Sequence, residues 1–119
     1  RDLWTLFSLG KFYAKNKEYE NAIKFLEEYN NLKTYNADAC LIMGYCYFKL
    51  AQFEKAEEKL HSSISLRAEN IPAMFNLAKT QLRLQKKEDA VLTLHKILAI
   101  KEDFGPAVNL LAKIKKVHE

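Results

Sequence analysis

The sequence repeats itself every 34 residues, and this period limits the possible folds more than any other feature. When the chain is shifted by 34, Gly10 falls on Gly44, and Gly44 falls on Ala78 and then Ala112. Other positions match in size at the same step: Leu9 with Met43, Leu77 and Leu111; Tyr13 with Tyr47; Tyr19 with Phe53; Ala22 with Ala56 and Ala90; Leu26 with Leu60 and Leu94. A fixed period of this length is typical of a chain that stacks one small structural unit several times.

Each unit has the hydrophobic spacing of two helices. Apolar or small residues recur at i, i+3, i+4 and i+7, once before and once after a short polar turn. In the first unit these residues are Leu6, Leu9, Gly10 and Tyr13, then Tyr19, Ala22, Ile23 and Leu26. The spacing predicts helices over 3–15 and 18–31, 37–49 and 52–66, 71–84 and 87–100, and a single last helix over about 105–118.

Residues at the predicted helix ends and the overall composition agree with an all-α fold. Asn36, Asn70 and Asp103 stand at or near helix starts, where a side-chain oxygen can accept from free backbone N–H groups. Pro72 and Pro106 fall in first turns, where the N–H that proline lacks has no partner in any case. With only three Gly and two Pro, the chain has little material for the turns of an all-β fold.

The segments "SLGKFY" and "IMGYCY", together with the 34-residue period and the later small Ala, resemble the tetratricopeptide repeat. The resemblance implies a right-handed superhelix of antiparallel helical hairpins. We expect residues 1–119 to form one such domain, with repeats at about 3–36, 37–70 and 71–104 and a capping helix at about 105–118. The third repeat departs from the pattern at Ala78, Gln81 and Lys87. Because the sequence begins at Arg1 and not Met, we expect it to be part of a longer chain.

The same resemblance implies a concave face, lined by the first helix of each pair, that binds a segment of another protein. At that register the sequence has many large apolar or cationic residues, and exposed apolar surface often marks a binding site. The residues at that register are Trp4, Phe7, Lys11, Ala14, Leu41, Tyr45, Phe48, Lys49, Phe75, Lys79, Leu82, Arg83, Asn109, Lys113 and Lys116. We predict a groove for an amphipathic helix or an extended peptide whose acidic side chains meet the Lys and Arg residues.

Two alternatives limit this prediction. The apolar residues could instead pack against the adjacent repeat, and the lysines could be ordinary solvated side chains. Lys15, Lys49 and Arg83 form a ladder at the 34-residue step, but each lies in the last turn of a predicted helix. A cation there complements the helix dipole by roughly 0.3–1 kcal/mol, so this ladder has a structural explanation.

One specific ligand of the family is disfavoured. Tetratricopeptide cochaperones that bind the acidic tails of cytosolic chaperones use a two-carboxylate clamp of Lys, Asn and Arg side chains. The matching positions here are Phe7, Lys11, Ile42, Pro72 and Asn76. Only Lys11 and Asn76 are polar, and neither is the residue that the clamp requires at its position.

The sequence does not favour catalysis, a metal, a cofactor or nucleic acid. His61 and His95 occupy equivalent places in successive units, but no neighbouring residues complete a metal-ligand spacing. The chain has no Gly-rich phosphate loop and no nucleophile elbow. The formal net charge of +4 is too small to indicate nucleic acid, although Lys11, Tyr45, Lys79 and Lys113 form a thin version of an RNA-binding stripe.

The sequence constrains the cellular compartment and the oligomeric state of the protein less than its fold. Cys40 and Cys46 lie about 120° apart around one predicted helix, so they cannot pair with each other, and two free thiols favour the cytoplasm. The longest apolar stretch, residues 39–48, is too short to cross a membrane. As an alternative to peptide binding, the chain could be a structural segment of a longer solenoid, or it could self-associate through its first helix, with Trp4 and Phe7 buried by another copy.

Overall fold

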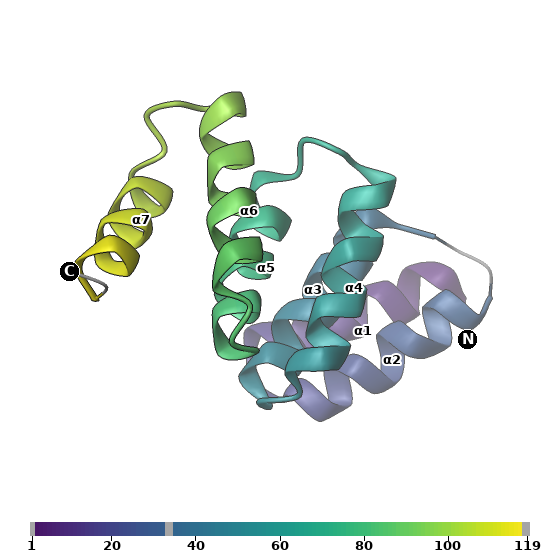
Figure 1. Ribbon diagram of the computed structural model, residues 1–119. Coiled ribbons are helices and arrows are strands. Elements are labelled where there is room, and N and C mark those ends of the chain that lie inside the picture. The colour runs from purple at the N-terminus through teal and green to yellow at the C-terminus, as the bar shows by residue number, and fades with distance from the viewer. Residues whose placement is uncertain (1, 33–34, 118–119) are drawn as a thin grey trace.

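The computed structural model describes residues 2–32 and 35–117, and this part of the chain contains seven helices and no strand (Figure 1). The helices are α1 (Leu3–Lys15), α2 (Tyr19–Asn31), α3 (Ala37–Lys49), α4 (Phe53–Leu66), α5 (Ile71–Arg83), α6 (Lys87–Ile100) and α7 (Gly105–Val117). Three-residue turns join α1 to α2, α3 to α4 and α5 to α6, so each pair is a helical hairpin. The hairpins stack side by side into an elongated body of 53 × 26 × 20 Å, with α7 at the end.

The helix limits agree with those predicted from the sequence to within one residue. α1, α3 and α6 have the predicted bounds, whereas α2 and α4 start one residue later and α5 ends one residue earlier. Glu18 and Gln52 precede α2 and α4 with ψ of 71° and 73°, outside the helical range, which explains the later starts. Position 118 of the predicted last helix lies outside the described residues.

The turn of each hairpin contains one residue in the left-handed conformation, again at the 34-residue step. These residues are Lys17, Ala51 and Gln85, with φ of 63°, 60° and 63°. None of them is glycine, although a residue with a Cβ is less stable in this conformation by roughly 1–2 kcal/mol. The repeat therefore keeps the turn geometry without the residue that favours it most.

Glycine is required where the two helices of a hairpin come closest. A Cβ on Gly10 would lie 2.5 Å from Cγ of Leu26, and a Cβ on Gly44 would lie 2.6 Å from Cγ of Leu60. Both leucines are fully buried, so they cannot move into solvent. The third hairpin has Ala78 at this register, and it is also fully buried. Small residues at this register therefore allow the two helices of each hairpin to approach closely.

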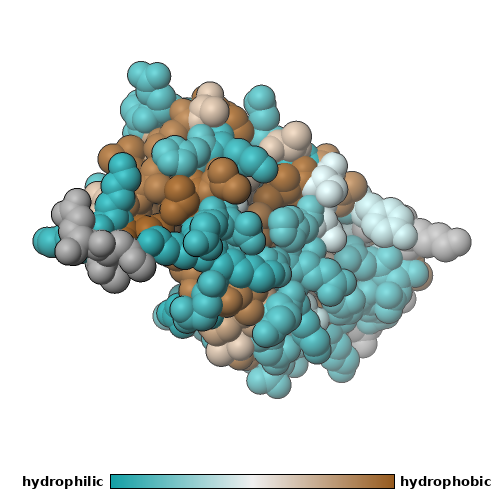
Figure 2. Space-filling model, in the orientation of Figure 1, coloured by the Kyte–Doolittle hydropathy of each residue, from teal (hydrophilic) through white to brown (hydrophobic). Residues whose placement is uncertain are grey.

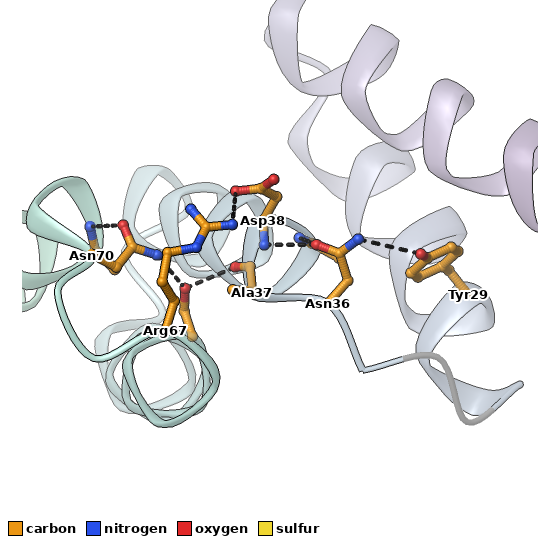
Figure 3. Close-up of polar contacts among 9 residues, drawn as sticks. Tyr29, Asn36, Ala37, Asp38, Arg67 and Asn70 are labelled. Atoms are coloured by element: carbon orange, nitrogen blue, oxygen red, sulfur yellow. Dashed lines mark hydrogen bonds and ion pairs between the residues drawn. The ribbon is translucent and has the colours of Figure 1, made fainter.

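Asparagine caps link one hairpin to the next (Figure 3). Asn36 accepts a hydrogen bond from the N–H of Asp38 at 2.8 Å, and its amide donates to the hydroxyl of Tyr29 at 3.4 Å. Asn70 accepts from the N–H of Ala73 at 3.2 Å, and its amide donates to Oγ of Ser63 at 3.0 Å. Tyr29 and Ser63 are 34 residues apart, so both caps reach the same place on the preceding hairpin. The predicted capping role of the two asparagines is confirmed.

The two cysteines are free and buried within α3. Burial raises the pKa of both thiols, and for Cys46 it raises the pKa to about 11. Both thiols are therefore protonated and unreactive near neutral pH. In the described part of the chain, no helix combines the length and the apolar character needed to span a membrane.

Candidate peptide-binding face

The residues predicted to bind a partner lie on α1, α3, α5 and α7, and none of them is fully buried. Trp4, Lys11, Tyr45, Lys49, Arg83, Asn109, Lys113 and Lys116 are exposed, and Phe7, Ala14, Leu41, Phe48, Phe75, Lys79 and Leu82 are half-buried. Trp4 is 79% exposed. α3 contacts both α1 and α5, so the residues of these three helices share one continuous face.

The aromatic rings of this face are partly used for packing. The ring of Phe7 lies 5.2 Å from that of Tyr29, and the ring of Phe75 lies 5.8 Å from that of Phe104. Leu41 also packs against a buried core cluster. The alternative that these side chains pack within or between repeats is therefore partly correct. Each of these side chains keeps some exposed surface, so the face offers apolar area whose side chains are held in place by packing.

Four cations of the face lie over aromatic rings. Lys11 lies 4.8 Å from the ring centroid of Phe7, and Lys49 lies 5.5 Å from that of Tyr45. Lys79 lies 5.6 Å from the ring centroid of Phe48 and 5.2 Å from that of Phe75. Arg83 lies 5.6 Å from the ring centroid of Phe48 and 5.4 Å from that of Phe53. Such contacts contribute about 0.5–1 kcal/mol each at exposed sites. They hold the cations close to the apolar surface without neutralising them.

Within the described ranges, no carboxylate pairs with any of these four cations. The ion pairs there are formed elsewhere, by Lys59 with Glu27 at 3.0 Å, Arg67 with Asp38 at 3.1 Å and Lys86 with Glu57 at 2.8 Å. Burial, and the neighbouring charge of Lys49, lower the pKa of Lys79. The face therefore carries positive charge that the described residues leave without an ion pair.

A pocket of about 350 Å³ opens where α1, α3 and α5 meet. Ala14, Leu41 and Tyr45 are among the residues that line it. Tyr19 and Pro72 also line it, although neither residue was predicted to bind the partner. Tyr19 begins α2, and its ring lies 6.1 Å from that of Tyr45, so the turn between α1 and α2 brings it to this face. The position of Tyr19 directly after the turn was the one feature of the sequence from which it could have been assigned to this face.

The positions of the two-carboxylate clamp do not provide the donors that the clamp needs. Phe7 packs on Tyr29, Pro72 lies in the first turn of α5, and Ile42 packs against a core cluster. In the described part of the chain, no group of three His, Cys, Asp or Glu side chains could hold a metal ion. His61 and His95 are both exposed on the second helices.

A comparison with protein families identifies the chain. The family model described as "Anaphase-promoting complex, cyclosome, subunit 3" matches residues 15–97, which are 83 of the 119 residues. The chain belongs to this family of tetratricopeptide-type repeats. No curated protein matches it.

Solved structures of tetratricopeptide domains have the same fold as this family member. The first TPR of Spaghetti (RPAP3), bound to the HSP90 peptide SRMEEVD, is 24% identical with a TM-score of 0.89, over 97% of this chain and 91% of that chain. The second TPR domain of human RPAP3, in complex with the HSP70 peptide SGPTIEEVD, is 22% identical with a TM-score of 0.86, over 96% and 98%. MamA is 26% identical with a TM-score of 0.86, over 89% and 62%. The family member is therefore an all-α tetratricopeptide solenoid, a fold of interaction modules that are generally not catalytic.

Proposed function

We propose that the family member is an adaptor whose face of α1, α3, α5 and α7 binds a peptide or helix of a partner protein that carries acidic side chains. The proposal rests on four cations, Lys11, Lys49, Lys79 and Arg83, which lie over aromatic rings and form no ion pair within the described residues. An acidic segment would neutralise them, while its apolar side chains would cover the half-buried rings. Aromatic and Arg residues are also the side chains that dominate binding energy in interfaces.

Lys79 is the centre of the proposed site. Its ammonium lies over the rings of both Phe48 and Phe75, and burial, with the nearby charge of Lys49, lowers its pKa. A bound carboxylate would remove that repulsion, so binding should stabilise both cations. The two TPR domains of RPAP3 that have the same fold are bound to the acidic peptides SRMEEVD and SGPTIEEVD. This family member has no matching clamp, so we propose a different placement of the acidic groups, over Lys49 and Lys79.

The proposal assigns no catalytic step and no cofactor to the chain. The free thiols and their burial support a reducing compartment such as the cytoplasm. RNA binding is a weaker candidate because the exposed cations of this face alternate with half-buried rings that already pack against their own repeats, which leaves few faces for base stacking.

A peptide-display selection tests the function. Selection on the native protein should enrich peptides that combine acidic and apolar residues. The double variant Lys49→Glu, Arg83→Glu changes two exposed side chains and should lose these peptides. The control Lys24→Glu, Lys101→Glu makes the same change of charge on exposed residues outside this face and should keep them. Equal loss in both variants would mean that binding follows net charge and not this face.

A second candidate function, self-association through the first hairpin, rests on a separate observation. Phe12 is 57% exposed, whereas Cys46 and Thr80, at the same register in α3 and α5, are completely buried. Leu3 and Trp4 add exposed apolar surface nearby. A second copy of the chain packed on α1 would bury Phe12, as Cys46 and Thr80 are buried in α3 and α5. Sedimentation at increasing protein concentration should then show a dimer that Phe12→Lys dissociates, and a constant monomer mass would exclude this candidate.

A further inference from the structure

A second pocket lies outside the proposed peptide-binding face. It has a volume of about 440 Å³ and opens between α4 and α6, which both pack against α5. Figure 1 shows α4 and α6 side by side, with α5 behind α6. Ile64, Met74 and Leu77 provide apolar lining, and the volume lies within the range of about 300–1,000 Å³ seen for small-ligand sites.

The preceding groove, between α2 and α4, is filled by the chain itself. The hydroxyl of Tyr47 donates to Oε1 of Glu27 at 3.5 Å, and Nζ of Lys59 lies 3.0 Å from the same oxygen. A phenol ring and a lysine stem therefore occupy the space that the helix stacking creates. The residues 34 positions later are Gln81 for Tyr47, Thr93 for Lys59 and His61 for Glu27. All three of these later residues line the open pocket.

The pocket is open because these side chains are shorter and turn toward each other. Oγ1 of Thr93 donates to Oε1 of Gln81 at 2.8 Å, and both residues are buried. In the first hairpin the same two positions hold Tyr13 and Phe25, whose rings stack at 5.5 Å with an interplanar angle of 6°. Two of the three hairpins thus place a tyrosine ring at this register, and the third leaves its place empty.

We propose that this pocket binds the phenol side chain of a tyrosine from a partner protein, in the place that Tyr47 occupies in the preceding groove. The ring would cover the apolar lining. Its hydroxyl would reach His61, which stands where Glu27 accepts from Tyr47. A neutral imidazole can accept this hydrogen bond.

The rim of the pocket favours a neutral side chain over a charged one. Glu57 and Asp89 balance Lys86 and Lys96, and Nζ of Lys86 lies 2.8 Å from Oε1 of Glu57. A phosphate or a carboxylate would meet two carboxylates as well as two ammonium groups. Leu92, which is 60% exposed, adds an apolar edge beside the opening. On the face drawn in Figure 2, hydrophobic residues gather over the α6–α7 half, whereas the α2–α4 half is largely hydrophilic.

Backbone-amide NMR shifts of the full chain, titrated with N-acetyl-tyrosinamide, test this site. We expect saturable shifts at pocket residues of α4 and α6, with a dissociation constant of about 1–10 mM because the probe has few atoms. N-acetyl-leucinamide, an aliphatic probe of similar backbone, should bind several-fold more weakly. Equal binding of the two probes would overturn the assignment of a phenol, and absence of saturable shifts in the pocket would overturn the site.

Variants that fill the pocket give an independent check. Gln81→Tyr restores the residue of the first two hairpins and should weaken probe binding at least about ten-fold. Thr93→Phe fills the pocket from α6 and should have the same effect, so the test survives if one variant fails to fold. The control Glu102→Tyr adds a tyrosine to an exposed turn outside the pocket and should keep native binding. Unchanged binding in a folded Gln81→Tyr or Thr93→Phe variant would overturn the proposal.

Discussion

Replacing Gly44 by alanine tests whether the close approach of α3 and α4 limits the residue at this position. The added Cβ would lie 2.6 Å from Cγ and 2.7 Å from Cδ2 of Leu60, whereas carbon atoms pack at about 3.5–4.0 Å. The Leu60 side chain would have to move by about 1 Å, and it is completely buried. Overpacking of this kind costs about 1–3 kcal/mol.

A second effect has the opposite sign. Alanine is more stable than glycine in a helix interior by about 1 kcal/mol. The net expectation for Gly44→Ala is therefore a loss of about 1 kcal/mol in the free energy of unfolding. Leu60→Ala alone should cost about 2–5 kcal/mol, because it leaves a cavity. In that background the clash is gone, so Gly44→Ala should stabilise the protein by about 1 kcal/mol.

The sign reversal is measured by urea denaturation of the four proteins of this cycle, followed by far-UV circular dichroism. The expected coupling energy is about 2 kcal/mol, within the range for residues in contact. Additive effects, within about 0.5 kcal/mol, would refute the argument that Gly44 and Leu60 compete for one space. Ala78→Gly serves as the control: it loses helix propensity and a buried methyl group, so it should cost about 2 kcal/mol.

Four further predictions follow from particular residues. Ala51→Gly should raise the free energy of unfolding by about 1 kcal/mol in urea denaturation, because Ala51 has φ of 60°. Asn70→Ala should lower it by about 2 kcal/mol, from a lost cap and a lost buried hydrogen bond. Lys49→Gln should raise the pKa of Lys79 toward 10.5 in an NMR titration, since one source of repulsion is removed. Burial raises the pKa of Cys46 from 9.0 to about 11, so between these pH values the native protein binds more protons than the unfolded protein. The free energy of unfolding should therefore fall as the pH rises from 9 to 11. Alkylation of this thiol at pH 8 should require unfolding.

The fold followed from the sequence because one small set of residues recurs at one spacing. Gly10 and Gly44 marked the close helix contacts, and Asn36 and Asn70 marked helix starts. The left-handed turn residues were not predictable in the same way. Ala51, for example, has no intrinsic preference for positive φ, and the constraint comes from the two helices that the turn must join.

The candidate site was only partly predictable. The helical register identified which side chains of the first helices share a face, because register depends on local geometry alone. It did not show that Phe7 packs on Tyr29 or that Tyr19 reaches Tyr45, since those contacts depend on how hairpins are placed relative to one another. Gln81 was identified as a departure from the repeat, but the pocket that it leaves open also depends on Thr93 across the groove.

The most direct test of the central claim is to map a selected acidic peptide onto the isotope-labelled native protein by backbone-amide chemical shifts. We expect saturable shifts to cluster on α1, α3 and α5, around Tyr45, Lys49 and Lys79, and to disappear in the Lys49→Glu, Arg83→Glu variant. Shifts that cluster on α2, α4 and α6, or that persist unchanged in that variant, would contradict the assignment of the binding face.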